Sequence, residues 1–168
     1  ERSLRVNSGD SANLSRTPTS AGSSNTFTFS FWVKRTGLGT SNRRVFGNDV
    51  SSVQFNIMFD SSDRLYIQGG LHPNTFALIT ERVFSDPSAW YHFVISFDKT
   101  ASTTVRIYCN GSEITTFSTS DYPTSTDSFS WNAAGAHYIG TLDGTNGNWD
   151  GMLAEVHFID GQALAATD

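Results

Sequence analysis

The sequence has 168 residues, which is the length of one globular domain. Hydrophobic residues make up 38% of the chain and aromatic residues 13%, which is enough to fill a core and excludes a disordered chain. The net charge of −5, with no basic run, argues against a nucleic-acid partner. A single cysteine, Cys109, excludes an intrachain disulfide scaffold. No stretch approaches the roughly 18 consecutive apolar residues of a membrane span, so membrane insertion is not expected. We expect one domain over residues 1–168, as a module of a longer chain.

Alternation of apolar and polar residues with a period of two predicts strands along most of the chain. The clearest run is Thr26–Arg35, whose apolar side chains share one face: Phe27, Phe29, Phe31 and Val33. The same pattern predicts further strands over residues 53–59, 64–68, 90–98, 104–109, 113–117, 137–140 and 152–159. Short strands separated by turns are typical of a sandwich rather than of alternating strands and helices.

The Asn110-Gly111 pair predicts a tight hairpin, because both central residues of a type I′ turn need a positive φ. Helical candidates are confined to a turn near residues 86–89 and the last few residues, and residues 117–130 read as a loop. Trp32 and Trp90 lie in predicted strands and are expected to fill the space between two sheets. The predicted fold is therefore an all-β jelly-roll sandwich of two antiparallel sheets.

Three segments together resemble a known family: Phe29–Lys34, then Trp90–Asp98 with Val105–Gly111, and finally Tyr138–Gly140 with Trp149–Leu164. Their order resembles the concanavalin A-like lectin/glucanase superfamily, in its laminin-G-like and pentraxin-like branch. Residues 3–18 and 154–161 are similar to laminin-G-like modules in structural proteins of marine tailed bacteriophages. The resemblance implies a jelly-roll fold and a binding role.

The segment 143–151 is rich in Asp, Asn and Gly and is the most site-like stretch. Closely spaced oxygen ligands are what Ca²⁺ prefers, and the resemblance implies calcium near the sandwich loops. We therefore take Asp143 and Asp150 as candidate calcium ligands. The alternative is a turn built from residues that tolerate the left-handed conformation.

Aromatic side chains in loops can stack on sugar rings, which makes three of them candidate ligand-binding residues: Tyr122, Trp131 and Trp149. Asn146 and Asn148 flank Trp149 and are predicted to supply hydrogen bonds to the same sugar. The alternative is that each ring caps an end of the sandwich. If Trp90 is core and Trp149 is loop, Trp90→Ala should cost about 3–5 kcal/mol and Trp149→Ala almost nothing.

Glycosidases on this fold need a pair of carboxylates on one face. The few Glu residues form no such motif, so we expect a protein that is not an enzyme. The first hypothesis is a virion structural module on a phage capsid or tail surface. Its partners would be viral structural proteins or further copies of itself, with host cell-surface glycans as a second contact. The alternative is an extracellular carbohydrate-binding module of a secreted bacterial enzyme or adhesin.

Overall fold

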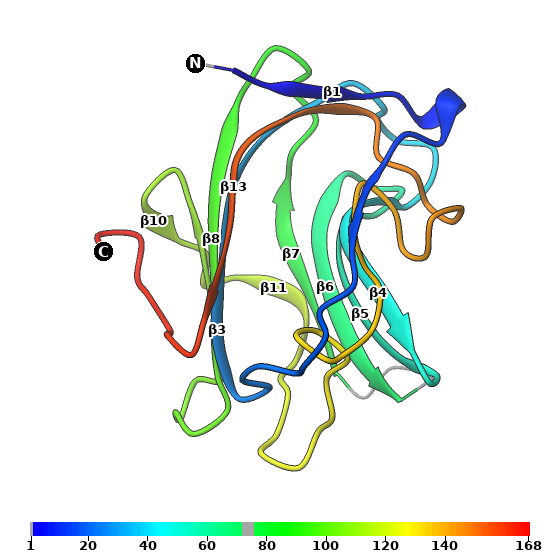
Figure 1. Ribbon diagram of the computed structural model, residues 1–168. Coiled ribbons are helices and arrows are strands. Elements are labelled where there is room, and N and C mark those ends of the chain that lie inside the picture. Colours follow the sequence, from blue (N-terminus) through cyan, green and yellow to red (C-terminus); the bar gives the residue numbers. More distant parts are fainter. Residues whose placement is uncertain (1, 72–75) are drawn as a thin grey trace.

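The computed structural model describes residues 2–71 and 76–168 and shows two antiparallel sheets packed face to face (Figure 1). The first sheet has the order β1 (Leu4–Val6), β13 (Gly151–Asp160), β3 (Thr26–Arg35), β8 (Tyr91–Asp98), β9 (Val105–Cys109), β10 (Ser112–Glu113). The second has the order β11 (Phe117–Asp121), β7 (Phe76–Val83), β6 (Arg64–Leu71), β5 (Val53–Phe59), β4 (Arg43–Val50), β12 (His137–Ile139), β2 (Leu14–Arg16). The predicted all-β sandwich is confirmed.

The core is a layer of Phe rings between the sheets. The four apolar side chains of β3 named above are fully buried, as their alternation predicted. Phe29 stacks on Phe55 of the opposite sheet with ring centroids 5.8 Å apart, and Phe31 meets Phe46 edge to face at 5.0 Å. Aromatic pairs in these geometries add to the stabilisation from area burial, so they help to hold the two sheets together.

The tryptophans are placed differently from the sequence prediction. Trp149 is fully buried and Trp131 is 6% exposed, whereas Trp32 is 38% exposed on the outer face of β3 and Trp90 is half-buried. The prediction that Trp149 lies exposed in a loop, with Trp90 and Trp32 between the sheets, is therefore wrong. The polar segment around Trp149 folds back over the end of the sandwich and inserts the ring against Phe59 at 5.8 Å.

The Asn110-Gly111 turn is confirmed, with φ of 51° and 82° and with Ser112 paired to Cys109. The returning strand is shorter than predicted, since β10 ends at Glu113. Phe117 begins β11, which pairs with β7 in the other sheet, so residues 117–130 are not all loop. Cys109 is free and buried, as expected for a small hydrophobic side chain.

The last strand, β13, contains a bulge that the alternation pattern did not reveal. Its pairing with β3 shifts between Ala154 and His157, where Glu155 adopts a left-handed φ of 47°. A bulge inserts an extra residue and so reverses which side chains face inward. Leu153 before it and Val156 after it both pack on the core, although strict alternation predicted opposite faces for them.

The structure also contains elements that the patterns missed, namely β1, β2, β4 and β7 and a short 3-10 helix, Ser8–Asp10. The two helical candidates, the turn near residues 86–89 and the last few residues, form turns and no helix. In the first, the Ser88 amide donates to Asp86 Oδ1 at 2.8 Å. The residues that the model describes contain no helix with the length and hydrophobicity of a membrane span.

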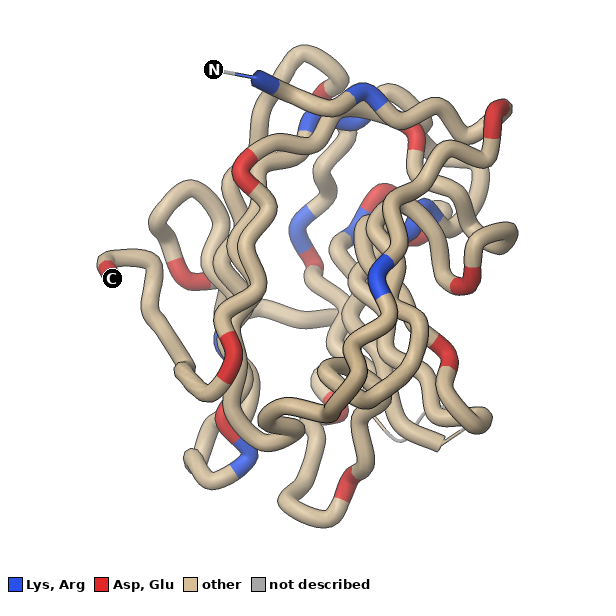
Figure 2. The backbone as a smooth tube through the Cα atoms, in the orientation of Figure 1, with Lys and Arg blue, Asp and Glu red and all other residues tan. Residues whose placement is uncertain are grey.

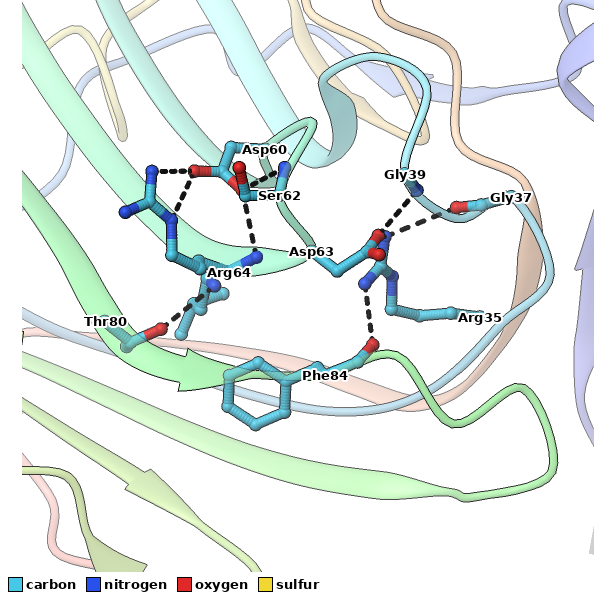
Figure 3. Close-up of polar contacts among 10 residues, drawn as sticks. Arg35, Gly37, Gly39, Asp60, Ser62, Asp63, Arg64, Thr80 and Phe84 are labelled. Atoms are coloured by element: carbon cyan, nitrogen blue, oxygen red, sulfur yellow. Dashed lines mark hydrogen bonds and ion pairs between the residues drawn. The ribbon is translucent and has the colours of Figure 1, made fainter.

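One end of the sandwich is tied by a buried ion pair between Arg35 and Asp63 (Figure 3). The Arg35 guanidinium donates to Asp63 Oδ1 at 2.7 Å and to the Phe84 carbonyl at 2.7 Å, and it lies 4.3 Å from the centre of the Phe59 ring. Asp63 Oδ1 also accepts from the Gly39 amide at 2.8 Å. These bonds join β3 of one sheet to the β5–β6 turn of the other.

Charged residues are distributed over both layers, with acidic and basic positions interleaved along the tube (Figure 2). Acidic and basic positions are therefore not segregated along the described backbone.

Candidate functional site

A cleft of about 620 Å³ opens at one side of the sandwich, between β13 of one sheet and β12 and β2 of the other. The segment 18–22 also lines the cleft. The lining residues are Leu14, Ser15, Arg16, Pro18, Thr19, Ser20, Ala21, Gly22, Phe46, Trp131, Asn132, His137, Tyr138, Ile139, Val156, Phe158 and Asp160.

The floor of the cleft is apolar because Trp131, in a turn, and Phe158, on β13, both line it. Trp131 packs on Phe29 at 4.7 Å and on Phe158 at 5.8 Å between centroids. Phe158 is 37% exposed and Leu14 is 52% exposed. Strand β2 has only three residues, so the second sheet ends there before its edge covers these rings. Exposed apolar side chains on a concave surface, here Phe158 and Leu14, are typical of a ligand site.

Hydrogen bonds fix one polar wall of the cleft. Asn132 Nδ2 donates to Asp160 Oδ1 at 2.8 Å and to the Ser23 carbonyl at 3.1 Å. The same Asp160 oxygen accepts from the Ser23 amide at 2.9 Å, and the Gly22 amide donates to the Asn132 carbonyl at 2.9 Å. These bonds tie the 18–22 segment to the end of β13, so this wall is preorganised.

His137 lines the cleft next to Asn132 and has a fixed ring orientation. Nδ1 lies 2.7 Å from the Gly135 carbonyl and Nε2 lies 2.9 Å from the Asn132 amide nitrogen, so Nδ1 donates and Nε2 accepts. Burial lowers the pKa of His137, and the charge of Arg16 lowers it further, against the opposing effect of the Gly135 bond. The ring is therefore neutral near pH 7 and stands edge-on to Trp131 at 4.7 Å.

The predicted calcium loop is a self-contained turn. Asp143 Oδ1 accepts from the Thr145 amide, the Thr145 hydroxyl and the Asn146 amide at 2.9–3.0 Å. Asp143 Oδ2 accepts from Asn146 Nδ2 at 2.6 Å. Burial opposes ionisation of this carboxyl, but the bonds from Asn146 and Thr145 outweigh it and lower its pKa to about 2.

Asp150 belongs to a different contact, since its carboxylate accepts from Thr36 Oγ1 at 3.0 Å and Ser8 Oγ at 3.5 Å. N–H and O–H donors surround both carboxylates where a cation would need free oxygens. The described residues contain no group of three or more His, Cys, Asp or Glu arranged to hold a metal ion. In this conformation the loop does not fit Ca²⁺, and the turn interpretation explains Asp143 better.

The other predicted ligand-binding residues are dispersed. Trp131 lies in the floor of the cleft, beneath more exposed side chains, and so the prediction that it is an exposed platform is wrong. Tyr122 is partly buried against Phe117 at 6.2 Å, on the side of β11. Asn148 donates to Ser11 Oγ at 3.1 Å, and its Oδ1 is buried without a hydrogen-bond partner, while Asn146 is held in the Asp143 turn.

Sequence reasoning missed most of the cleft. Asn132 directly follows Trp131, which was a predicted ligand-binding residue, and His137 begins the strand predicted over residues 137–140. Both residues therefore lie next to features that the sequence analysis had recognised. Asp160 and Phe158 come from a strand recognised only as a fold element. No local pattern connects residues 14–22, 131–139 and 156–160, which are brought together only by the pairing of the edge strands.

A family model described as the concanavalin A-like lectin/glucanases superfamily matches residues 7–168. The chain belongs to this superfamily, in its laminin-G-like branch. No curated protein matches the sequence.

Several solved structures have a similar fold at low sequence identity to this chain. The chain is similar to domain 4 of AbnA, an extracellular arabinanase from Geobacillus stearothermophilus solved with arabinotriose, with TM-score 0.60, 23% identity and coverage of 84% of this chain and 64% of that chain. It thus spans somewhat less than two thirds of that relative.

The CBM40 of the Ruminococcus gnavus IT-sialidase has TM-score 0.63 and 11% identity, over 94% of this chain and 95% of that chain. The heptameric SAP-like pentraxin from Limulus polyphemus has TM-score 0.59 and 16% identity, over 90% and 70% of the two chains. At these identities the likeness establishes the fold alone.

Proposed function

We propose that this domain is a non-enzymatic carbohydrate-binding module and that the cleft between β13 and β12 is its glycan site. The observation that carries the proposal is the combination of an aromatic floor, Trp131 and Phe158, with polar walls already ordered by hydrogen bonds. A sugar ring has apolar C–H faces and a polar rim, so it matches both parts of such a site.

Two of the similar structures support the same class of ligand. The arabinanase domain was solved with arabinotriose, and the sialidase domain is a carbohydrate-binding module by name. Asp160 is the one carboxylate among the described residues that line the cleft. Hydrolysis of a glycosidic bond generally uses two, which favours binding without cleavage.

A glycan array with the purified domain tests the proposal. We expect selective binding, reduced about tenfold or more in Phe158→Ala, which removes an exposed part of the floor, and also in Arg16→Ala, which lies on the exposed rim. Leu71→Ala, at an exposed apolar position on β6, serves as the matched control and should bind like the parent. An array without any bound glycan, or cleft variants that bind as the parent does, would contradict the proposal.

The virion setting is a separate proposal that rests on the resemblance of residues 3–18 and 154–161 to phage structural modules. In that setting the domain would sit on a capsid or tail surface, contact neighbouring viral subunits or its own copies, and present the cleft to host glycans. The alternative is an extracellular module of a secreted bacterial enzyme or adhesin, which the similar structures favour. Stoichiometric recovery of the domain from purified phage particles distinguishes the two settings.

A further inference from the structure

The outer face of the six-stranded sheet carries an exposed tryptophan that the cleft does not use. Trp32 lies in the middle of β3 between Phe31 and Val33, which are both fully buried, and is itself 38% exposed. It therefore points away from the core and from the second sheet. The exposed part of this ring lies on the outer face of the sheet, outside the core, and is available for contact.

One face of this indole is covered by an ordered partner. The rings of Trp32 and His92 stack with centroids 4.8 Å apart and an interplanar angle of 25°. His92 Nε2 lies 3.0 Å from Ser30 Oγ, and the His92 amide donates to Asn110 Oδ1 at 2.8 Å. The imidazole is thus fixed in place, and it restrains the indole before any ligand arrives, which lowers the entropic cost of binding.

The other flank of the indole adjoins a small residue. Ala154 of β13 is the direct cross-strand partner of Trp32, on the side opposite His92. Directly opposite side chains on one face lie roughly 5 Å apart, and a methyl group is too small to cover an indole. The bulge that follows carries Glu155 and His157, which are 65% and 59% exposed and lie 3.6 Å apart.

We propose that Trp32 is the stacking platform of a second glycan site, for a neutral oligosaccharide of β-linked pyranose rings. Such rings carry equatorial hydroxyls and present flat C–H faces that fit the uncovered side of an indole. Glu155 follows Ala154 in the bulge and is exposed, so it supplies an acceptor for sugar hydroxyls, and Lys34, two residues along β3 on the same face, supplies a donor. This site is on the outer surface, and its existence does not depend on a ligand in the cleft.

Isothermal titration with cellohexaose, a soluble β-1,4-linked glucose oligomer, tests the inference on the whole domain. Trp32→Ala should weaken binding about tenfold or more, while Trp32→Phe, which keeps a smaller ring, should retain part of the affinity. Leu71→Ala, at an exposed position on the other sheet, should bind like the parent. Because Trp32 is outside the core, thermal unfolding of Trp32→Ala should match that of the parent, which shows that the loss is not a failure to fold.

Three outcomes overturn the inference. Absence of cellohexaose binding removes the proposed ligand class, although a glycan that binds the cleft on the array would leave the first proposal standing. Binding lost in Phe158→Ala but kept in Trp32→Ala places the oligosaccharide in the cleft instead. Self-association that disappears in Trp32→Ala, measured by sedimentation without any effect on cellohexaose binding, assigns the face to a second copy of the chain.

Discussion

Trp149 shows that a residue's immediate sequence does not decide its burial. It lies among Asn, Asp and Gly residues, yet its side chain is fully buried and its Nε1 has no hydrogen-bond partner. We expect Trp149→Ala to destabilise the fold by about 3–5 kcal/mol, because it leaves a cavity beside Phe59. Urea unfolding measures this change, with half-buried Trp90→Ala as the comparison. A larger loss in Trp90→Ala than in Trp149→Ala would contradict the structure.

The lowered pKa of Asp143 makes the stability of the fold depend on pH. Its folded-state pKa of about 2 lies below the unfolded value near 3.8, so the carboxylate stabilises the fold above pH 4, and this contribution is lost as the pH falls toward 2. Allowing for partial solvent screening, the contribution is about 1–2 kcal/mol.

We therefore expect Asp143→Asn to lower the free energy of unfolding at pH 7 and to differ progressively less from the parent between pH 4 and pH 2. Denaturation at several pH values provides the measurement. Added Ca²⁺ should leave the melting temperature of the parent unchanged, because N–H and O–H donors already occupy the Asp143 oxygens. A calcium-dependent rise that Asp143→Asn abolishes would restore the metal-site interpretation.

At the scale of elements, the strands with clear alternation were predictable and their irregularities were not. Phe27 to Val33 specify β3 because one buried face requires an apolar residue at every second position. The bulge at Glu155 follows no comparable rule, so strict alternation placed Leu153 and Val156 on opposite faces, although both pack on the core. Strand β4 was missed because its sequence includes Arg43, Arg44 and Gly47 among the apolar positions and so lacks clean alternation.

Gly47 explains how the β12–β13 loop is seated on the second sheet. A Cβ at this position would lie 2.5 Å from Leu142 Cα and 2.6 Å from the Thr141 carbonyl oxygen, both of which belong to the backbone. Gly47→Ala should therefore displace the loop and cost about 1–3 kcal/mol. Limited proteolysis should show faster cleavage within residues 141–150.

Gly9→Ala is a matched control, because its added Cβ would meet Asn7 Oδ1 at an ordinary 3.4 Å. It should change stability by less than about 0.5 kcal/mol. If Gly47→Ala and Gly9→Ala change the free energy of unfolding by the same amount, the close approach of the loop to Gly47 does not determine the position of the loop.

For the whole molecule, composition and strand spacing were sufficient to predict a two-sheet sandwich, because a chain of this length with alternating Phe must bury one face of each sheet. The cleft was beyond prediction, since its walls come from three distant segments and its shape depends on where the edge strands stop. Trp131 was the one predicted binding residue that the fold brings to it.

The Arg35–Asp63 pair and the cleft lie toward opposite ends of β13, since Gly151 pairs with Arg35 whereas Phe158 and Asp160 pair with Phe29 and Phe27. The ion pair therefore joins the two sheets at one end of β13, and the cleft opens near the other end of the same strand. The cleft therefore lies away from the ion pair that joins the sheets, and its Asn132–Asp160 wall is held by hydrogen bonds of its own.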